Sequence, residues 1–376
     1  MPNNWFIYDT IPTTYPQQLN YTTGDGTVGH YEVTEEYAVS LRATTTFTKN
    51  DTLIFNLIDI GTTYKTGTYQ KIIEYITKIT VDVDIVLFVG SANYGPTFDL
   101  DSFEHILSFT IRQNTNTTRT STESLNFNNC ANLTSIIPDK LSISQLTANN
   151  CPVLTGNLDL QYCSDSLTIV NAGYAPAPPT LGGITLLTFS STQPITSIYV
   201  PYTSITNLSL NTTMHTSLLT INVNGCSKLK NDAGDGTQNP LDLSAFTSLS
   251  TFNANNTLYE SIKFGTGIST INMQNCSNLS EISFSTSQIS TLNLLNCTLL
   301  QSIPNLTTTN FSPTPTINLS GTDIDSIILD SLDSTNITYP ETMQSLNITN
   351  SSQSGTLNLS TFSSLSSKHL MVYSFI

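Results

Sequence analysis

Apolar and polar residues alternate in a unit that recurs along most of the chain. Two segments show it most clearly, Ser269–Phe284 (STINMQNCSNLSEISF) and Ser290–Leu306 (STLNLLNCTLLQSIPNL). Aligned at Cys276 and Cys297, both read apolar-x-apolar-x-x-Cys, followed by an apolar residue three positions later. Alternation with period two is typical of a β-strand with one buried face, and its repetition predicts a stack of similar coils.

The same frame recurs about ten times between residues 121 and 376, at spacings of about 19 to 31 residues. Each coil contributes two apolar side chains that we expect to face a continuous core. These pairs are Leu125/Phe127, Leu146/Ala148, Val170/Ala172, Ile198/Val200, Ile221/Val223, Phe252/Ala254, Ile271/Met273, Leu292/Leu294, Ile317/Leu319 and Leu346/Ile348. The repeat predicts a solenoid of about ten coils.

This region resembles the leucine-rich-repeat superfamily, whose pattern is L-x-x-L-x-L-x-x-N/C-x-L. Besides the two cysteine segments, Ile195–Ile205 (ITSIYVPYTSI) and Leu249–Leu258 (LSTFNANNTL) carry the resemblance. It implies a solenoid with one parallel sheet. The chain departs from the family because the return limb of most coils is a short β-type segment, as in irregular repeats of surface proteins. These segments are Asn157–Leu160, Asn207–Leu210, Pro240–Leu243, Ser261–Phe264, Ser326–Leu329 and Thr356–Leu359.

The N-terminal third lacks this repeat and is richer in basic residues. Residues 31–112 carry β-branched and aromatic runs that predict a small β-sandwich-like anchoring domain. An extended arm is expected over residues 1–30, with a turn at Gly24–Gly26, and a polar linker or N-cap over residues 113–124. The solenoid would cover residues 125–376 and end in a cap strand, LMVYSFI. The predicted fold is therefore mainly β.

The cysteines follow the repeat. Cys130, Cys151, Cys226, Cys276 and Cys297 share one position, which other coils fill with Thr, Ser or Ala, while Cys163 falls on a return limb. That position is expected to face inward, with neighbours about one strand spacing (~4.8 Å) apart. Side chains in such a column point the same way and stack instead of bridging. The sequence predicts a structural ladder of buried thiols, formed in a reducing compartment, and no metal site.

Between the two inward residues of each strand lies one outward residue, and most of these are Asn. They are Asn126, Thr147, Asn171, Tyr199, Asn222, Asn253, Asn272, Asn293, Asn318 and Asn347. Two interpretations remain open for this column. The amides can bond one another in a ladder that stiffens the sheet, or they can recognise sugar hydroxyls.

Aromatic residues interrupt the Asn column on the third and fourth coils. Tyr174, Tyr199 and Tyr202 are expected there as a platform on which a sugar ring can stack, with Asn222 and Asn253 beside it. Clustered aromatic residues are also common at protein interfaces. The predicted ligand is therefore a host surface glycan or a host surface protein.

Composition narrows the class of protein. The chain has 12 Lys+Arg and 27 Asp+Glu, a net charge of −15, yet only 10% of its residues are charged, compared with about 25% in typical soluble proteins. The lack of a basic patch argues against nucleic-acid binding, and 38% hydrophobic content argues against disorder. The longest apolar stretch, near Ile85–Gly90, is far shorter than the ~20 residues that span a bilayer, so no membrane insertion is expected.

Catalytic groups are not assembled in any known pattern. His30, His105, His215 and His369 are scattered and suggest no triad. Two carboxylate pairs, Asp323/Asp325 and Asp232/Asp235, are expected in turns or loops. We expect a protein that is not an enzyme and needs no cofactor.

The surface composition, rich in Thr, Ser and Asn, is typical of proteins that work outside cells. The start of the chain, MPNNWFIYDT, lacks the basic region and apolar core of a secretory signal. Together with reduced cysteines, this predicts a virus (phage) fibre or capsid-decoration protein, assembled in the cytoplasm and exposed extracellularly on the virion. Its N-terminal domain would bind other virion or capsid proteins. The alternatives are a cell-surface leucine-rich-repeat adhesin and, third, a glycan-cleaving tailspike-like enzyme.

Overall fold

The fold is mainly β, and its stacked coils form a β-solenoid of about nine turns. The chain divides into two units, Met1–Ile195 with Ser209–Asn211, and Thr196–Leu208 with Thr212–Ile376. The helical segments among the described residues are two short 3-10 helices, η1 (Glu35–Tyr37) and η2 (Thr212–His215). The computed structural model describes residues 4–8, 12–22, 28–40, 52–56, 85–89, 97–99, 108–112, 121–138, 142–163, 165–174, 183–230, 240–285, 287–304, 306–332 and 336–349.

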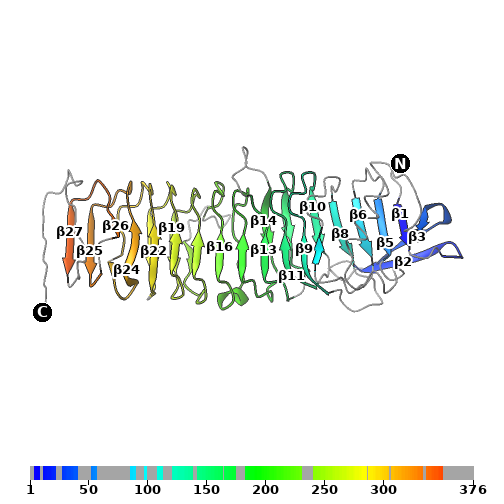
Figure 1. Ribbon diagram of the computed structural model, residues 1–376, viewed down its shortest axis with the longest axis horizontal. Helices are drawn as coiled ribbons and strands as arrows, with labels where there is room; N and C mark the ends of the chain where they lie inside the picture. The colour runs from blue at the N-terminus through cyan, green and yellow to red at the C-terminus, as the bar shows by residue number, and fades with distance from the viewer. Residues whose placement is uncertain are drawn as a thin grey trace. The chain divides into compact units, whose positions relative to one another are not determined.

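The first unit contains a parallel sheet with the order β4-β1-β5-β6-β8-β10. Figure 1 shows its strands side by side. The strands are β1 (Asn4–Tyr8), β4 (Ala38–Ser40), β5 (Thr52–Asn56), β6 (Ile85–Val89), β8 (Ser108–Arg112) and β10 (Ser135–Pro138). The sheet is parallel throughout, which is typical of a solenoid in which every coil crosses in the same direction.

The described residues among 1–30 lie largely in paired strands, where the sequence predicted an extended arm. The apolar run Trp5–Tyr8 lies in β1, between β4 and β5, where Phe6, Ile7 and Tyr8 are buried. β2 (Gln17–Thr22) and β3 (Val28–Val33) then pair as an antiparallel hairpin. Their residues Leu19 and Val33 pack with Phe6, so apolar burial fixes this segment; the expected turn at 24–26 lies outside the described residues.

The β-sandwich-like domain expected over residues 31–112 is not confirmed. The described strands that begin in this range, β4 to β8, all pair in parallel: β4, β5, β6 and β8 lie in one sheet and β7 lies in another. Much of the range lies outside the described residues. The expected linker at 113–124 is also too long. Its last residues belong to β9 (Ser121–Asn126), whose Leu125 is fully buried, and residues 113–120 lie outside the described ones.

The first unit also contains coils that follow the predicted frame. β7 (Thr97–Asp99), β9, β11 (Ser142–Thr147) and β13 (Ile169–Asn171) pair in parallel and in register. Leu125, Leu146 and Val170 lie opposite one another and are fully buried. On the return limbs, β12 (Gly156–Asp159) pairs in parallel with β14 (Ile184–Thr188).

The main sheet of the second unit is parallel, and its inward and outward positions stay aligned apart from one register irregularity between Ile289 and Thr291. Its order is β15 (Ser197–Tyr199), β16 (Thr220–Asn222), β18 (Thr251–Asn253), β20 (Thr270–Asn272), β22 (Ile289–Asn293), β24 (Phe311–Asn318) and β26 (Ile337–Thr338). One apolar column, Ile198, Ile221, Phe252, Ile271, Leu292 and Ile317, is fully buried along these strands. Five successive strands, β16 to β24, therefore confirm the repeat read from the sequence.

The return limbs of the second unit form two further parallel sheets. One contains β17 (Leu241–Leu243), β19 (Ser261–Phe264) and β21 (Glu281–Phe284), and the other contains β23 (Leu306–Thr307), β25 (Ser326–Asp330) and β27 (Ser345–Thr349). Phe252 of the main sheet packs edge-on against Phe264 of β19, at 5.3 Å between ring centroids. The core of this unit therefore lies between the main sheet and the return limbs. The expected limb at 207–210 is not a strand, and the one at 356–359 lies outside the described residues.

The last coil corrects the predicted frame. Leu346 and Ile348 lie on β27, in a return-limb sheet, while Ile337 of β26 continues the main apolar column. Both segments alternate apolar and polar residues, so periodicity alone could not separate them. Asn347 therefore does not belong to the outward Asn column, and the cap strand expected at 370–376 lies outside the described residues.

The turn after most of the described main strands contains a residue with positive φ. Asn fills this position, which we call the turn column, in five coils with φ between 57° and 60°. These residues are Asn129, Asn150, Asn256, Asn275 and Asn296. Gly225 and Gly321 take the same place with φ of 72° and 70°. Asn tolerates this left-handed conformation better than most other residues. Asn therefore precedes Cys or Thr in many coils because the turn needs a residue that accepts positive φ.

An amide ladder runs along this turn column, three positions after the strand-centre Asn column where a ladder was expected. The Nδ2 group of Asn275 donates to Oδ1 of Asn256 at 3.1 Å, and that of Asn296 donates to Oδ1 of Asn275 at 2.9 Å. The strand-centre Asn residues behave differently. Asn222, for example, accepts the backbone N–H of Asn224 at 3.1 Å within its own turn.

The cysteine column lies inside the coils, and all six cysteines are buried thiols. Cys226 Sγ donates to the carbonyl of Val200 in the preceding coil at 3.1 Å, and Cys276 does the same to Ala254 at 3.1 Å. Where Thr takes the position, as at Thr203, the hydroxyl donates to a carbonyl of its own coil, here Val200 at 2.9 Å. Small donors at this position therefore satisfy buried carbonyl groups that face the core.

We expect the substitution Asn275→Ala to lower the free energy of unfolding by about 1–2 kcal/mol, because Ala pays the steric cost of the left-handed region. Asn275→Gly removes the same amide but suits the backbone, so its loss should be smaller. Urea unfolding of both variants measures the difference. Equal losses would show that the amide ladder, and not the backbone conformation, determines the choice of Asn.

We expect the native protein to react slowly with a maleimide at pH 8, since all six thiols are buried. Burial also raises the pKa of Cys226 to about 11, so that roughly one Cys226 thiol in 10³ is ionised at pH 8, and the reaction of this thiol should accelerate as the pH rises towards that pKa. After denaturation without reductant, six thiols should titrate. A count of two or fewer would contradict the reduced column.

Candidate functional site

The outward side of the main sheet in the second unit presents two columns of uncharged side chains. Strands β16, β18, β20, β22 and β24 each carry Thr and, two residues later, Asn, in matching register. We call this surface the Thr–Asn face; it consists of Thr220, Thr251, Thr270, Thr291, Thr316, Asn222, Asn253, Asn272, Asn293 and Asn318. We call the Thr and Asn of one strand a rung, and neighbouring rungs lie about one strand spacing apart, ~4.8 Å. The face is thus periodic and carries no charge of its own.

Four of the five Asn side chains on this face, Asn222 among them, accept a hydrogen bond within their own turn. Oδ1 of Asn293 accepts the backbone N–H of Leu295 at 3.3 Å, and Oδ1 of Asn318 accepts that of Ser320 at 3.1 Å. Asn272 accepts instead from the side chain of Gln274, at 3.0 Å. These contacts resemble Asx turns and occupy the carbonyl oxygen. The Nδ2 group is then the part of each amide that can donate to an external acceptor.

A serine column borders the Thr residues and is satisfied internally. The hydroxyl of Ser269 donates to the carbonyl of Ser250, and that of Ser290 donates to the carbonyl of Ser269, both at 3.1 Å. These bonds link each coil to the preceding one. The serines therefore maintain the register of the stack, while the neighbouring Thr column lies on the outward face.

Two tyrosines lie at the β15 end of the Thr–Asn face. Tyr199 on β15 lies opposite Asn222 on β16. Tyr202 occupies the turn position that Asn fills elsewhere, with φ of 57°. A bulky side chain in this region is unusual and such strain costs of order 1–3 kcal/mol. Its ring lies against Gly225 of the next coil, where a Cβ atom would be only 2.2 Å from Tyr202 Cδ1.

Asn224 departs from the behaviour of its counterparts in other coils. Oδ1 of Asn128 accepts the backbone N–H of Asn149 in the next coil at 2.9 Å, and Oδ1 of Asn255 accepts that of Gln274 at 2.8 Å. Asn224 instead donates its Nδ2 to the hydroxyl of Tyr202 at 3.3 Å. Its Oδ1 is buried and has no hydrogen-bond partner among the described residues, which costs about 1–3 kcal/mol.

The two tyrosines and Asn224 thus form a locally strained end of the uncharged face. We call Tyr199, Tyr202, Asn222 and Asn224 the tyrosine end. Asn222, predicted from the sequence, belongs to both the Thr–Asn face and the tyrosine end, and Asn253, also predicted, lies beside it on the Thr–Asn face. Asn224 and Gly225 were missed. The available signal was Gly225 itself, because Gly replaces Asn in the turn column immediately after the coil with Tyr202.

Tyr174, the third member of the predicted platform, is not available as an exposed ring. It belongs to the first unit, is only 6% exposed, and donates its hydroxyl to the carbonyl of Cys151 at 2.9 Å. Burial raises the pKa of Tyr174 to about 12. The residue lies close to Gly183, where an added Cβ would be 3.1 Å from its ring. Tyr174 therefore has a packing role, and the aromatic candidates reduce to Tyr199 and Tyr202.

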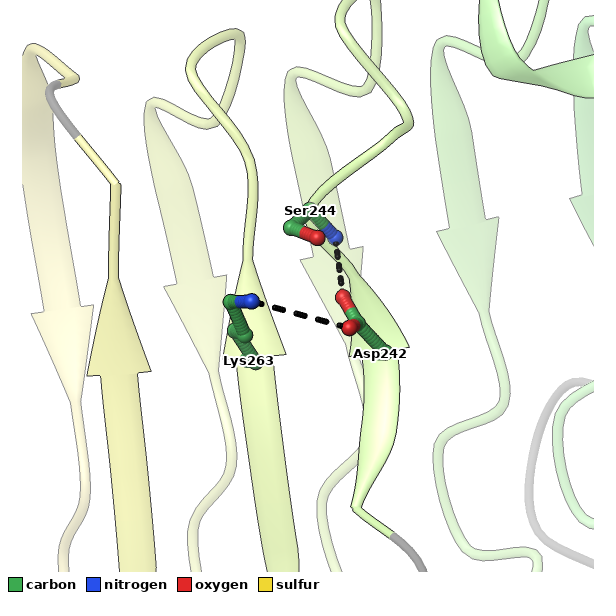
Figure 2. A network of polar contacts seen from close by, with 3 residues as sticks. All are labelled: Asp242, Ser244 and Lys263. Carbon is green, nitrogen blue, oxygen red and sulfur yellow. Dashed lines mark hydrogen bonds and ion pairs between the residues drawn. The ribbon is translucent and has the colours of Figure 1, made fainter.

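Charge lies instead on the return limbs. Figure 2 shows Asp242 of β17 between the backbone of Ser244, which donates at 2.8 Å, and the ammonium group of Lys263 on β19, at 3.6 Å. Hydrogen bonds from Ser244, with the nearby Lys263 charge, lower the pKa of Asp242. Both side chains are about half exposed, so this ion pair contributes little to stability. It belongs to the sheet that runs behind the Thr–Asn face.

Groups suited to metal binding or catalysis are dispersed in the part of the chain that the structure describes. No cluster of three or more His, Cys, Asp and Glu residues occurs there. Asp323 and Asp325 are exposed in the connection between β24 and β25, and Asp232 and Asp235 lie outside the described residues. No described helix is long and apolar enough to cross a bilayer.

Comparisons of the chain with protein-family models, with characterised proteins and with solved structures find no match. The candidate site is therefore defined by the geometry of the Thr–Asn face and its tyrosine end.

We expect Tyr202→Asn, which restores the residue common in the turn column, to raise the free energy of unfolding by about 1 kcal/mol, since it relieves backbone strain and frees the Asn224 amide. Urea unfolding measures this change. Tyr199→Asn is the matched control, because that residue lies in a strand and carries no positive φ, so no stabilisation is expected. A marked loss of stability in Tyr202→Asn would mean that the ring is a structural element of the stack.

Proposed function

We propose that the protein is a non-enzymatic structural and binding component of a virus particle, a phage fibre or capsid-decoration protein. In this proposal the solenoid, of leucine-rich-repeat type, projects a recognition surface towards the host. The first unit, including the anchoring domain over residues 31–112, contacts other virion or capsid proteins. The observation that carries the proposal is the Thr–Asn face, a periodic uncharged surface that ends at Tyr199 and the strained Tyr202.

The thiol column supports assembly in the cytoplasm. All six cysteines are buried thiols, and disulfides are rare where thiols are kept reduced. The core then needs no oxidising compartment to form. A virus protein assembled inside the host and released by lysis meets both conditions, a reduced core and a surface that works outside cells.

The low charge of the surface supports recognition of a neutral ligand. Only 10% of the residues are charged, and the ten residues of the Thr–Asn face carry none. Long-range steering requires a charged patch, so contact at this face should depend on shape and hydrogen bonding. Tyr199 and Tyr202 supply the aromatic area that often dominates binding energy at recognition surfaces.

Mass spectrometry of purified particles and of host envelope fractions tests this function. We expect the protein to sediment with particles through a density gradient and to stay with them after a salt wash. Detection only in host membranes or secretions would contradict the virion proposal and favour a cell-surface adhesin. A known capsid protein and a known envelope protein serve as markers for the two fractions.

A further inference from the structure

We propose that the Thr–Asn face binds one extended, neutral polysaccharide strand that lies along the solenoid axis, with a sugar ring stacked at the tyrosine end. This inference deepens the proposed function, on which it rests, by naming the ligand class and the residues that contact it. It is argued from periodicity, from hydrogen-bonding chemistry and from the strain at Tyr202.

Periodicity favours a linear polymer as the ligand. Thr220, Thr251 and Thr270 lie opposite one another on consecutive strands, and the column continues through β22 and β24. The rungs repeat at ~4.8 Å, a distance similar to the length of one sugar unit in an extended chain. A polymer that repeats along the same axis can make the same contact on every rung, whereas a folded protein presents an irregular surface.

The chemistry of the two columns suits sugar hydroxyls. Each Thr hydroxyl can both donate and accept, as a sugar hydroxyl can. The carbonyl oxygens of four of the five Asn residues accept hydrogen bonds within the protein, for instance that of Asn318 from the N–H of Ser320, so these amides offer donors to hydroxyl or ring oxygens. Since all ten side chains are neutral, an anionic polymer gains no additional attraction. Binding should therefore change little with salt concentration.

The tyrosine end fits a terminal subsite. The ring of Tyr202 lies over Gly225, and its hydroxyl holds the amide of Asn224 away from the arrangement used in other coils. Asn224 Oδ1 is left buried without a partner among the described residues. If Tyr202 moves to stack on a sugar, Asn224 is released and its oxygen can accept a hydrogen bond. Ligand binding then relieves a cost that the unbound protein carries.

Length dependence is the main expected signature. A single hydrogen bond to a neutral group gives a small net gain, so one sugar on one rung binds weakly. Each further sugar that reaches another rung adds a similar contact without a new loss of translational freedom. Affinity should increase with chain length until the ligand spans β16 to β24, and then level off.

The experiment measures binding of the full chain to deproteinised, neutral host-surface polysaccharide and to its fragments of increasing length, by calorimetry. A polyuronate of matched length is the anionic comparison. We expect affinity to rise with fragment length, and Thr251→Val with Thr270→Val to weaken binding of long fragments about tenfold with little change in melting temperature. Ser283→Ala, on the return-limb strand β21, is the matched control and should bind as the unmodified protein does. Tyr202→Asn should weaken binding of every fragment while the protein becomes more stable.

The outcomes separate the inference from the function on which it rests. Affinity that is independent of length, unchanged binding in the double Thr variant, or tighter binding of the polyuronate would overturn the polysaccharide track. So would attachment to host cells that is lost after protease but survives periodate oxidation of sugars, which indicates a protein receptor. Particles that contain the protein but bind no neutral polysaccharide would leave the virion proposal standing alone. Length-dependent binding by a protein that is absent from particles would support the polysaccharide track and contradict the virion proposal.

Discussion

Backbone hydrogen bonding between successive coils is the constraint on which the rest of this structure depends. Gly225 donates its N–H to Asn255 of the next coil at 2.7 Å, and Asn256 donates to Gln274 at 2.8 Å, so each coil satisfies its neighbour in a fixed register. Because buried polar backbone groups must be paired, every position in a coil has one permitted chemistry. Apolar side chains fill the inward strand positions, small donors of the Cys226 type bond core-facing carbonyls, and Asn or Gly makes the turn. The Thr–Asn face consists of the positions that remain once these requirements are met.

This constraint explains which parts of the fold could be predicted from the sequence. Strands β16 to β24 could be, because apolar alternation and the inward Cys or Thr mark the same register in each coil. The frame failed at Leu346, since β27 alternates in the same way as a main strand although it pairs with β25. It failed again at the N-terminus, where Trp5–Tyr8 belongs to a coil but no cysteine marks it. Periodicity identifies a strand, whereas its sheet is decided by the turns that connect it.

The candidate site could be predicted only in part, for a related reason. Tyr199, Tyr202 and Asn222 followed from columns that are visible in the sequence. Tyr174 belongs to the same kind of pattern, yet its ring is buried and its hydroxyl donates to the carbonyl of Cys151. Sequence spacing does not show which way a side chain points. Asn224 could not be selected from sequence at all, because its amide is distinguished by a contact with Tyr202 and by an unsatisfied oxygen. Both are properties of side-chain geometry.

A repetitive stack makes departures from the repeat informative. In a solenoid each coil interacts mainly with its neighbours, so strain at one coil is confined and the remaining interfaces keep their stability. Tyr202 replaces Asn at a left-handed turn, requires Gly225 beside it, and disturbs Asn224, three linked departures in two adjacent coils. Asn at this turn would avoid most of the backbone strain. Tyr202, Gly225 and Asn224 lie together at one end of the regular, uncharged Thr–Asn face, so the structural requirements of the stack alone do not explain this end of the face.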